Sequence, residues 1–140
     1  MIDHTFPWAH FDGASQENKS GGGATLFISP PHHFKIQMGL GIGTNNYVEL
    51  MDVKLLLCFA IEIGCKRIHI FGDSLLMINW INKVQKCQNV FLLVLIEEIM
   101  QHLEGFDTNT CLHVYRERNT EADQLSKKGL NTLHGQWLIT

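Results

Sequence analysis

Four acidic residues stand at comparable points of the chain: Asp12, Glu49, Asp73 and Asp123. Asp12 and Asp73 end short apolar runs, whereas Glu49 and Asp123 fall in the first turn of predicted helices. In α/β sheets, ligands bind outside the carboxyl ends of the strands, where the following helices begin. Turn pairs and helix caps explain each acid taken singly. The four together predict one site at one edge of a sheet.

A cluster of four carboxylates has a specific chemistry. Such groups cannot all stay ionised unless cations neutralise them. Ligation by oxygen alone selects Mg²⁺ or Mn²⁺, whereas zinc sites are built from His and Cys. Two such ions about 3.5–4 Å apart activate a water and stabilise the leaving oxyanion of a phosphodiester. The acids therefore predict two bound Mg²⁺ or Mn²⁺ ions and phosphodiester cleavage.

The elements that must position these acids follow from the apolar periodicity of the chain. Strand-like segments are predicted at residues 8–11, 24–29, 33–40, 68–71 and 110–115. Helical segments are predicted at residues 46–64, 74–81, 89–103 and from residue 120 onward. The polar segment 15–20 is expected to form the first turn. This order indicates a mixed sheet with helices packed on its faces.

The composition is that of a globular protein. The chain has 140 residues, 45% of them hydrophobic and 18% charged, which fits one domain over residues 1–140 and excludes disordered and fibrous classes. No apolar run approaches the roughly 20 residues of a membrane span. Residues 1–7 lack the basic start and apolar stretch of a signal peptide. We therefore expect an intracellular protein, in the cytoplasm or nucleus, with no membrane partner.

Cysteine spacing and net charge add little to the functional argument. The four cysteines, Cys58, Cys65, Cys87 and Cys111, include no CxxC pair, which argues against a zinc knuckle or a disulfide framework and favours buried, reduced thiols. The formal net charge of −3 does not exclude a nucleic-acid partner. Four acids gathered in one metal site would leave the remaining charges nearly balanced.

Four ordered motifs resemble those of type 1 ribonuclease H, most closely the ribonuclease H-like domains of plant retroelement reverse transcriptases. They are Phe11–Ser15 with Gly21–Ala24, Thr44–Leu50, Phe71–Ser74 and His113–Ser126, and they cover about residues 8–130. The resemblance implies an α/β fold with a five-stranded mixed sheet in the order 3-2-1-4-5 and helices on both faces. It also implies endonucleolytic cleavage of the RNA strand of RNA–DNA hybrids. The four acids named above would be the metal ligands and catalytic carboxylates.

The same resemblance implies nine residues that would hold the hybrid: Gly13, Ala14, Ser15, Asn18, Thr44, Asn45, Asn46, Trp80 and Arg116. Backbone amides of the first three, together with Asn18, would approach RNA sugars, whose 2′-hydroxyl separates RNA from DNA. The adjacent asparagines would reach into the minor groove, and Thr44 would bond a phosphate of the DNA strand. Trp80 would line the groove under the DNA sugars, and Arg116 would face a phosphate.

Three of these roles have structural alternatives that the sequence leaves open. Thr44 and Asn45 would instead precede and cap a helix. Trp80 would instead be a core residue. Arg116 would instead form a solvated surface pair with Glu117.

The chain departs from the family pattern in two places. Many members carry a catalytic histidine in a flexible loop before the last helix, where this chain has Arg116–Asn119. His113 lies upstream, in a predicted strand, so we do not assign it that role. Some relatives have an extra basic helix, whereas residues 89–105 contain acids and no Lys or Arg. We therefore expect modest affinity for the hybrid.

Two other functions fit part of the sequence. The first is a catalytically weak nucleic-acid-binding or connecting module of a retroelement polyprotein, and the complete set of four acids weighs against it. The second is a small phosphatase or nucleotide-binding protein built around Gly21–Gly23, but this cluster lacks the spacing of phosphate loops and opens no helix. We expect a monomer whose partners are the RNA–DNA hybrid and, in a polyprotein, the neighbouring domains.

Overall fold

The computed structural model describes residues 6–140. Of residues 1–7, which lack the features of a signal peptide, residues 1–5 therefore lie outside the described part. The strands are β1 (Trp8–Gln16), β2 (Lys19–Ser29), β3 (His32–Gly41), β4 (Arg67–Gly72), β5 (Thr108–His113) and β6 (Trp137–Ile139). The helices are α1 (Asn45–Glu62), α2 (Leu75–Ile81), α3 (Val90–Glu104) and α4 (Thr120–Gly129), with a short 3-10 helix, η1 (Arg116–Arg118).

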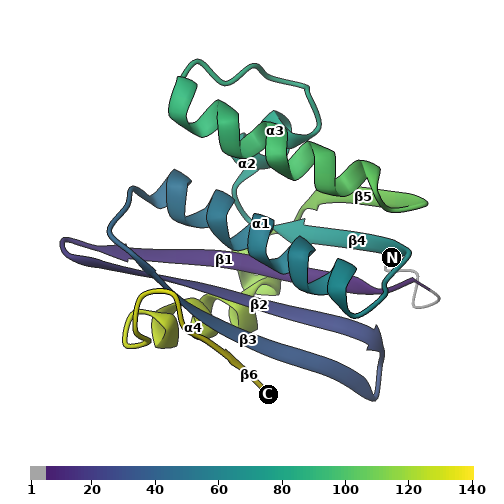
Figure 1. The fold of residues 1–140 in the computed structure, drawn as a ribbon, viewed down its shortest axis with the longest axis horizontal. Coiled ribbons are helices and arrows are strands. Elements are labelled where there is room, and N and C mark those ends of the chain that lie inside the picture. Colours follow the sequence, from purple (N-terminus) through teal and green to yellow (C-terminus); the bar gives the residue numbers. More distant parts are fainter. Residues whose placement is uncertain (1–5) are drawn as a thin grey trace.

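The sheet is mixed and has the order β5-β4-β1-β2-β3-β6 (Figure 1). β1, β2 and β3 form an antiparallel meander, and β4 and β5 run parallel to β1. The predicted order 3-2-1-4-5 is confirmed, but the predicted number of five strands is wrong. β6 adds to the free edge of β3, with Trp137 opposite Met38. A strand of three residues is too short to show an alternating pattern.

The β1–β2 hairpin is longer than the sequence pattern indicates. Residues 15–20 do not form the predicted turn, because Ser15 pairs with Ser20 and only residues 17–18 lie between the two strands. Gly21–Gly23 lie inside β2 and pair with β1 through the backbone alone. Glycine is unfavourable in strands because it has no side chain to pack, and this concealed the true length of β2.

Helices cover both faces of the sheet, with α1 in front of the strands and α4 behind them in Figure 1. The glycines of β2 allow α4 to lie directly on the strand backbone. A Cβ atom at Gly23 would come within 2.2 Å of the Ser126 backbone nitrogen and 2.4 Å of the Ala122 carbonyl oxygen. The glycine cluster therefore serves helix packing, which removes the argument for a nucleotide-binding loop.

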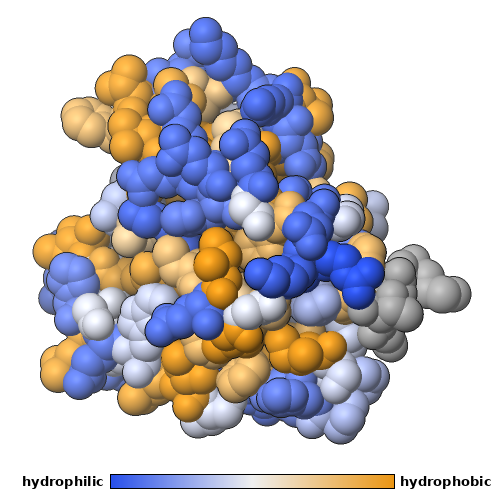
Figure 2. Space-filling view, turned by 45° about the vertical axis from the view of Figure 1, so that its right-hand side comes forward, coloured by the Kyte–Doolittle hydropathy of each residue, from blue (hydrophilic) through white to orange (hydrophobic). Residues whose placement is uncertain are grey.

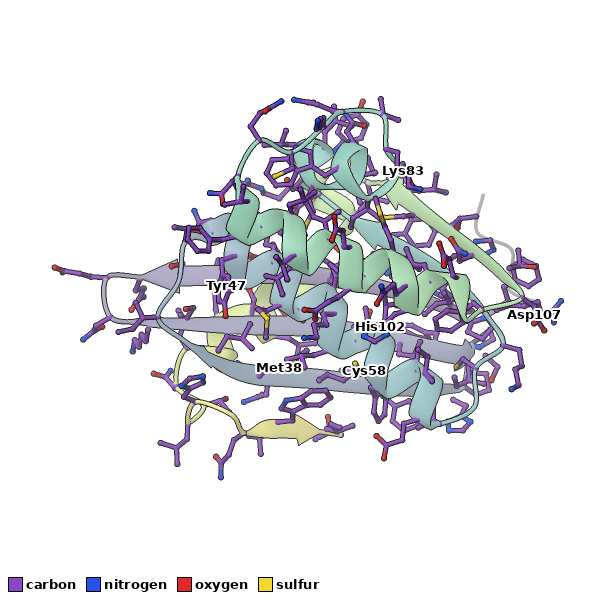
Figure 3. All side chains as sticks on the ribbon, turned by 45° about the horizontal axis from the view of Figure 1, so that its top comes forward. Met38, Tyr47, Cys58, Lys83, His102 and Asp107 are labelled. Atoms are coloured by element: carbon purple, nitrogen blue, oxygen red, sulfur yellow. The ribbon has the colours of Figure 1, made fainter. Side chains whose placement is uncertain are left out.

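α3 packs against α1. The Sγ atom of Cys58 on α1 lies 3.5 Å from Nε2 of His102 on α3, and both residues are labelled in Figure 3. An ion pair between Lys54 and Glu98 joins the same two helices, with 2.5 Å between Nζ and Oε2.

All four cysteines are free. Cys87 and Cys111 are buried as predicted, whereas the other two are only half-buried.

Within residues 6–140, no helix is both long and apolar enough to cross a membrane.

Hydrophobic residues gather at the upper left of Figure 2, in the part of the molecule formed by α2 and α3. The large exposed hydrophobic residues in this part are Leu75, Leu76, Val84, Val90, Phe91 and Val94. Because α3 carries apolar and acidic side chains without Lys or Arg, it offers no cationic surface to phosphates.

Candidate active site

Two neighbouring strands bring Asp12 and Asp73 together. β1 and β4 pair only from Trp8 to His10 of β1, and Asp73 follows β4 directly. Asp12 does not end its strand as predicted, because β1 continues past this point in pairing with β2 alone. The two carboxylates therefore meet where β1 and β4 stop pairing.

Helix α1 carries Glu49 to the same place. Its N-cap is Thr44, whose Oγ1 accepts a hydrogen bond from the Tyr47 amide at 3.3 Å. α1 thus begins one residue earlier than predicted, and Glu49 is its fifth residue. Gly13 makes room for Glu49, since a Cβ atom there would lie 2.8 Å from its Cγ. One carboxylate oxygen from each of Asp12, Glu49 and Asp73 lies within 4.8 Å of the other two.

The electrostatics of this group of three favour a bound cation. Burial, followed by the charge of Asp73, raises the pKa of Asp12 to about 7. Burial, followed by the charges of Asp12 and Asp73, raises the pKa of Glu49 to about 8, against a smaller opposing effect of Arg116. Oxygen ligands without His or Cys suit a hard divalent ion such as Mg²⁺ or Mn²⁺. The residues therefore fit the metal that the sequence predicts.

Asp123 lies beside the three carboxylates of Asp12, Glu49 and Asp73. Its carboxyl group is close enough to Asp12 to contribute to the raised pKa of Asp12. Its Oδ2 also lies 3.1 Å from Nζ of Lys127, one turn later on α4. Asp123 thus acts on Asp12 electrostatically, while its ion pair is with Lys127, for which the sequence predicted no role.

Asn119 supports the site from the residue before α4. Its Nδ2 donates to the Phe11 carbonyl oxygen at 2.9 Å and to Oδ2 of Asp73 at 3.2 Å. It therefore ties the end of β4 to β1 at the level of the carboxylates. Asn119 belongs to the last of the four sequence motifs, but its role was not predicted, because only the fold shows what its amide reaches.

Asp52 is a second supporting residue that the sequence argument missed. It is 0% exposed and lies one helical turn after Glu49, and its Oδ2 accepts a hydrogen bond from the Asp12 amide at 3.1 Å. The sequence feature that could have revealed Asp52 is its position three residues after Glu49, among the apolar residues of a predicted helix.

Gly13, Ala14 and Ser15, three of the four residues predicted to approach RNA sugars, line a hollow beside the carboxylates. Its volume is about 560 Å³, and its lining includes Gly13, Ala14, Ser15, Lys19 and Lys127. The Ser15 hydroxyl donates to the Gly43 carbonyl oxygen at 2.7 Å, so its side chain is already engaged with the loop before α1. Asn18 is exposed in the turn that joins β1 and β2.

The other predicted contacts divide into exposed and buried positions. Asn45 is exposed and Asn46 half-buried in the first turn of α1, whose N-cap is Thr44. Trp80 is only 9% exposed and belongs to the hydrophobic core, which favours its structural alternative. Arg116 is exposed and close enough to Glu49 to lower its pKa. Within residues 6–140 no ion pair joins it to Glu117.

The segment expected to replace the family histidine is short and partly helical. η1 occupies three of the four residues between Tyr115 and Thr120, and the backbone amides of Arg118 and Asn119 close this turn by donating to the carbonyl oxygens of Tyr115 and Arg116. His113 is the last residue of β5, and its ring makes an edge contact with the ring of Tyr115 at 5.5 Å between centroids.

The raised pKa values predict how metal-free stability depends on pH. Asp12 and Glu49 bind protons more tightly in the folded chain than in the unfolded one. Their contribution is therefore fully present below about pH 4 and is lost as the pH rises through about 7 to 8. We expect the metal-free melting temperature to fall from about pH 5 to about pH 8.

Millimolar Mg²⁺ is expected to remove most of this fall, because the ion replaces the protons that the carboxylates lose. The measurement is thermal unfolding at several pH values with and without Mg²⁺. A matched series at equal ionic strength in NaCl controls for screening. Equal pH dependence in both series would contradict the assignment.

Comparisons with known proteins agree with this fold. Ribonuclease H1 of the archaeon Halobacterium salinarum superposes with a TM-score of 0.82 at 27% identity, over 89% of this chain and 97% of that chain. The N-terminal ribonuclease H domain of a Mycobacterium tuberculosis protein, solved as a fusion with maltose-binding protein, has a TM-score of 0.78 at 25% identity, over 89% and 93%. These matches confirm the predicted ribonuclease H-like fold.

A further structure shares the fold at lower identity. Ribonuclease H1 isolated from compost, solved in complex with an RNA/DNA hybrid, has a TM-score of 0.73 at 19% identity, over 89% of this chain and 96% of that chain. No curated protein sequence matches the chain. The sequence model of the reverse transcriptase-like family matches residues 10–129, which run from β1 to the end of α4 and contain all four acids. The chain therefore belongs to the reverse transcriptase-like family.

Proposed function

We propose that this protein cleaves the RNA strand of RNA–DNA hybrids, with two Mg²⁺ or Mn²⁺ ions held by Asp12, Glu49, Asp73 and Asp123. The observation that carries the proposal is the group of three carboxylates within 4.8 Å of one another. It stands on a fold shared with ribonucleases H1, one of which was solved with an RNA/DNA hybrid. The family match supports a place among the domains of a retroelement polyprotein.

The protein's own residues would hold the reacting groups in place. Bound Mg²⁺ or Mn²⁺ supplies the charge that activates water and neutralises the departing oxygen. Asp12 and Asp73 provide anionic oxygens from two adjacent strands, and the Asn119 amide limits rotation of Asp73. Glu49 adds a third oxygen from α1. Asp123 would complete the site from α4.

The hollow beside the carboxylates is the proposed position of the RNA strand. Its lining combines backbone at Gly13–Ser15 with two lysines, Lys19 and Lys127. Lysine ammonium groups neutralise phosphates, and backbone groups near the sugars can bond the 2′-hydroxyl. This arrangement would distinguish RNA from DNA by contact with the sugar rather than the base.

The test is a cleavage assay on end-labelled RNA–DNA hybrid, duplex DNA and duplex RNA, each with Mg²⁺, Mn²⁺ or EDTA. We expect internal cuts in the RNA strand of the hybrid only, and none with EDTA. Binding to the hybrid without cleavage in either metal would favour the alternative, a catalytically weak connecting module. Cleavage of duplex DNA at a comparable rate would contradict the proposed substrate.

Hybrid binding is expected to depend only weakly on salt. α3 carries no Lys or Arg, and the carboxylates repel phosphates unless metal is bound. Each neutralised phosphate contributes about −0.9 to the slope of log affinity against log salt. Only a few contacts are available, so we expect a slope of about −2 to −4, measured by fluorescence anisotropy with Ca²⁺ in place of Mg²⁺. A slope of about −8 or steeper would contradict this.

A further inference from the structure

Asp52 is an acidic residue whose side chain is fully buried. It lies on α1 with 0% of its surface exposed, and burial raises its pKa well above the ordinary value. Its one hydrogen bond among the described residues is to the backbone of the sheet, because Oδ2 accepts from the Asp12 amide at 3.1 Å. Asp12 and Gly23 are directly opposite each other in β1 and β2. Asp52 therefore ties β1 to α1 at Asp12.

The second oxygen of Asp52 has no partner. Among the described residues, Oδ1 is buried and accepts or donates no hydrogen bond. The strand beneath it is glycine, and a Cβ atom at Gly22 would lie only 3.0 Å from Oδ1. Burying a carboxyl group with an unsatisfied oxygen costs stability. Stability of the fold alone therefore does not account for an acid at this position.

The alternation of the strands shows from which side Asp52 acts. A Cβ atom at Gly22 would meet Asp52 of α1, whereas one at Gly23 would meet α4. Side chains of directly opposed residues share a face, so the Asp12 carboxylate lies on the α4 face with Gly23. Asp52 thus fixes the Asp12 backbone from the face opposite its carboxylate.

Asp52 and Glu49 are one turn apart on α1, so a hydrogen bond between Asp52 and the Asp12 backbone also fixes where Glu49 lies relative to Asp12. We propose that Asp52 is a positioning residue of the metal site, which sets the distance between the Asp12 and Glu49 carboxylates by holding the Asp12 amide to α1. The inference rests on the metal site of the proposed function. Residues that orient metal ligands typically contribute about 10–100-fold to metal affinity when removed.

The test compares Asp52→Ala, Asp52→Asn and a control, Thr25→Val, by the Mg²⁺ concentration that half-saturates the rise in melting temperature. Asp52→Ala removes the acceptor, so we expect it to need about 10–100-fold more Mg²⁺. Asp52→Asn keeps an acceptor oxygen and should stay close to wild type. Thr25 is a buried polar residue of β2, and its replacement should leave the Mg²⁺ requirement unchanged. If Asp52→Ala does not fold, Asp52→Leu, which also lacks the acceptor, takes its place.

The outcomes separate this inference from the proposed function. An altered melting temperature in Asp52→Ala with an unchanged Mg²⁺ requirement would mean a structural role only and would overturn the inference. A loss in Asp52→Asn as large as that in Asp52→Ala would also overturn it, since the hydrogen bond would then not be the cause. Wild-type protein that binds Mg²⁺ but does not cleave the hybrid would refute the proposed function while the positioning of Asp12 stands. Wild-type protein that Mg²⁺ does not stabilise would refute both.

Discussion

Asp73→Asn is expected to lower cleavage of an RNA–DNA hybrid by about a thousandfold or more while the chain stays folded. Metal ions contribute several kcal/mol to stabilisation of transition-state charge, and each 1.4 kcal/mol or so is a tenfold change in rate. An amide cannot supply the anionic oxygen that Asp73 contributes to the group of three. The change keeps the size of the side chain, and Asn119 retains its second bond, to Phe11.

The measurement is single-turnover cleavage of labelled hybrid at saturating Mg²⁺, with circular dichroism to check the fold. Asp107→Asn is the matched control because it makes the same change of charge. Asp107, labelled in Figure 3, is exposed and directly precedes β5. Asp73 follows β4, which runs parallel to β5, so the two residues lie at opposite ends of this strand pair. The control variant should cleave like wild type. Cleavage by Asp73→Asn within a few-fold of wild type would remove Asp73 from the site.

Gly23→Ala is expected to destabilise the fold by about 3 kcal/mol, the upper part of the range for overpacking in a core. The added methyl would lie 2.2 Å from the Ser126 nitrogen and 2.4 Å from the Ala122 carbonyl oxygen, so α4 would have to move away from β2. For a chain of this size that loss corresponds to a fall of roughly 10 °C in melting temperature. Because α4 carries Asp123, hybrid cleavage should fall as well.

Thermal and urea unfolding measure this effect. Gly105→Ala is the control, because Gly105 is exposed with a helical φ of −73° and a Cβ atom there would meet only the His102 carbonyl oxygen, at 3.2 Å. Glycine-to-alanine changes at compatible positions alter stability by less than about 1 kcal/mol. If Gly23→Ala unfolds at the same temperature as this control, the close packing of α4 on β2 is wrong.

The sequence alone was enough to predict the family, the order of five strands and the acids Asp12, Glu49 and Asp73 that the structure brings together. These features depend on local patterns, since periodicity places an acid relative to its own strand or helix. Two strand predictions were wrong, and in both cases the reason lies in the local sequence. Glycines concealed the length of β2, and three residues were too few to reveal β6.

Only the tertiary structure decided what each side chain meets. Glu49 and Asp52 have the same kind of sequence surroundings on α1, yet Glu49 lies among the candidate metal ligands, whereas Asp52 is bonded to the Asp12 amide. Trp80 is in the core, although its sequence position equally suited a groove. Asp123 meets Lys127 as well as Asp12. Contacts between residues far apart in the chain depend on how helices pack across a sheet, and no local pattern contains that information.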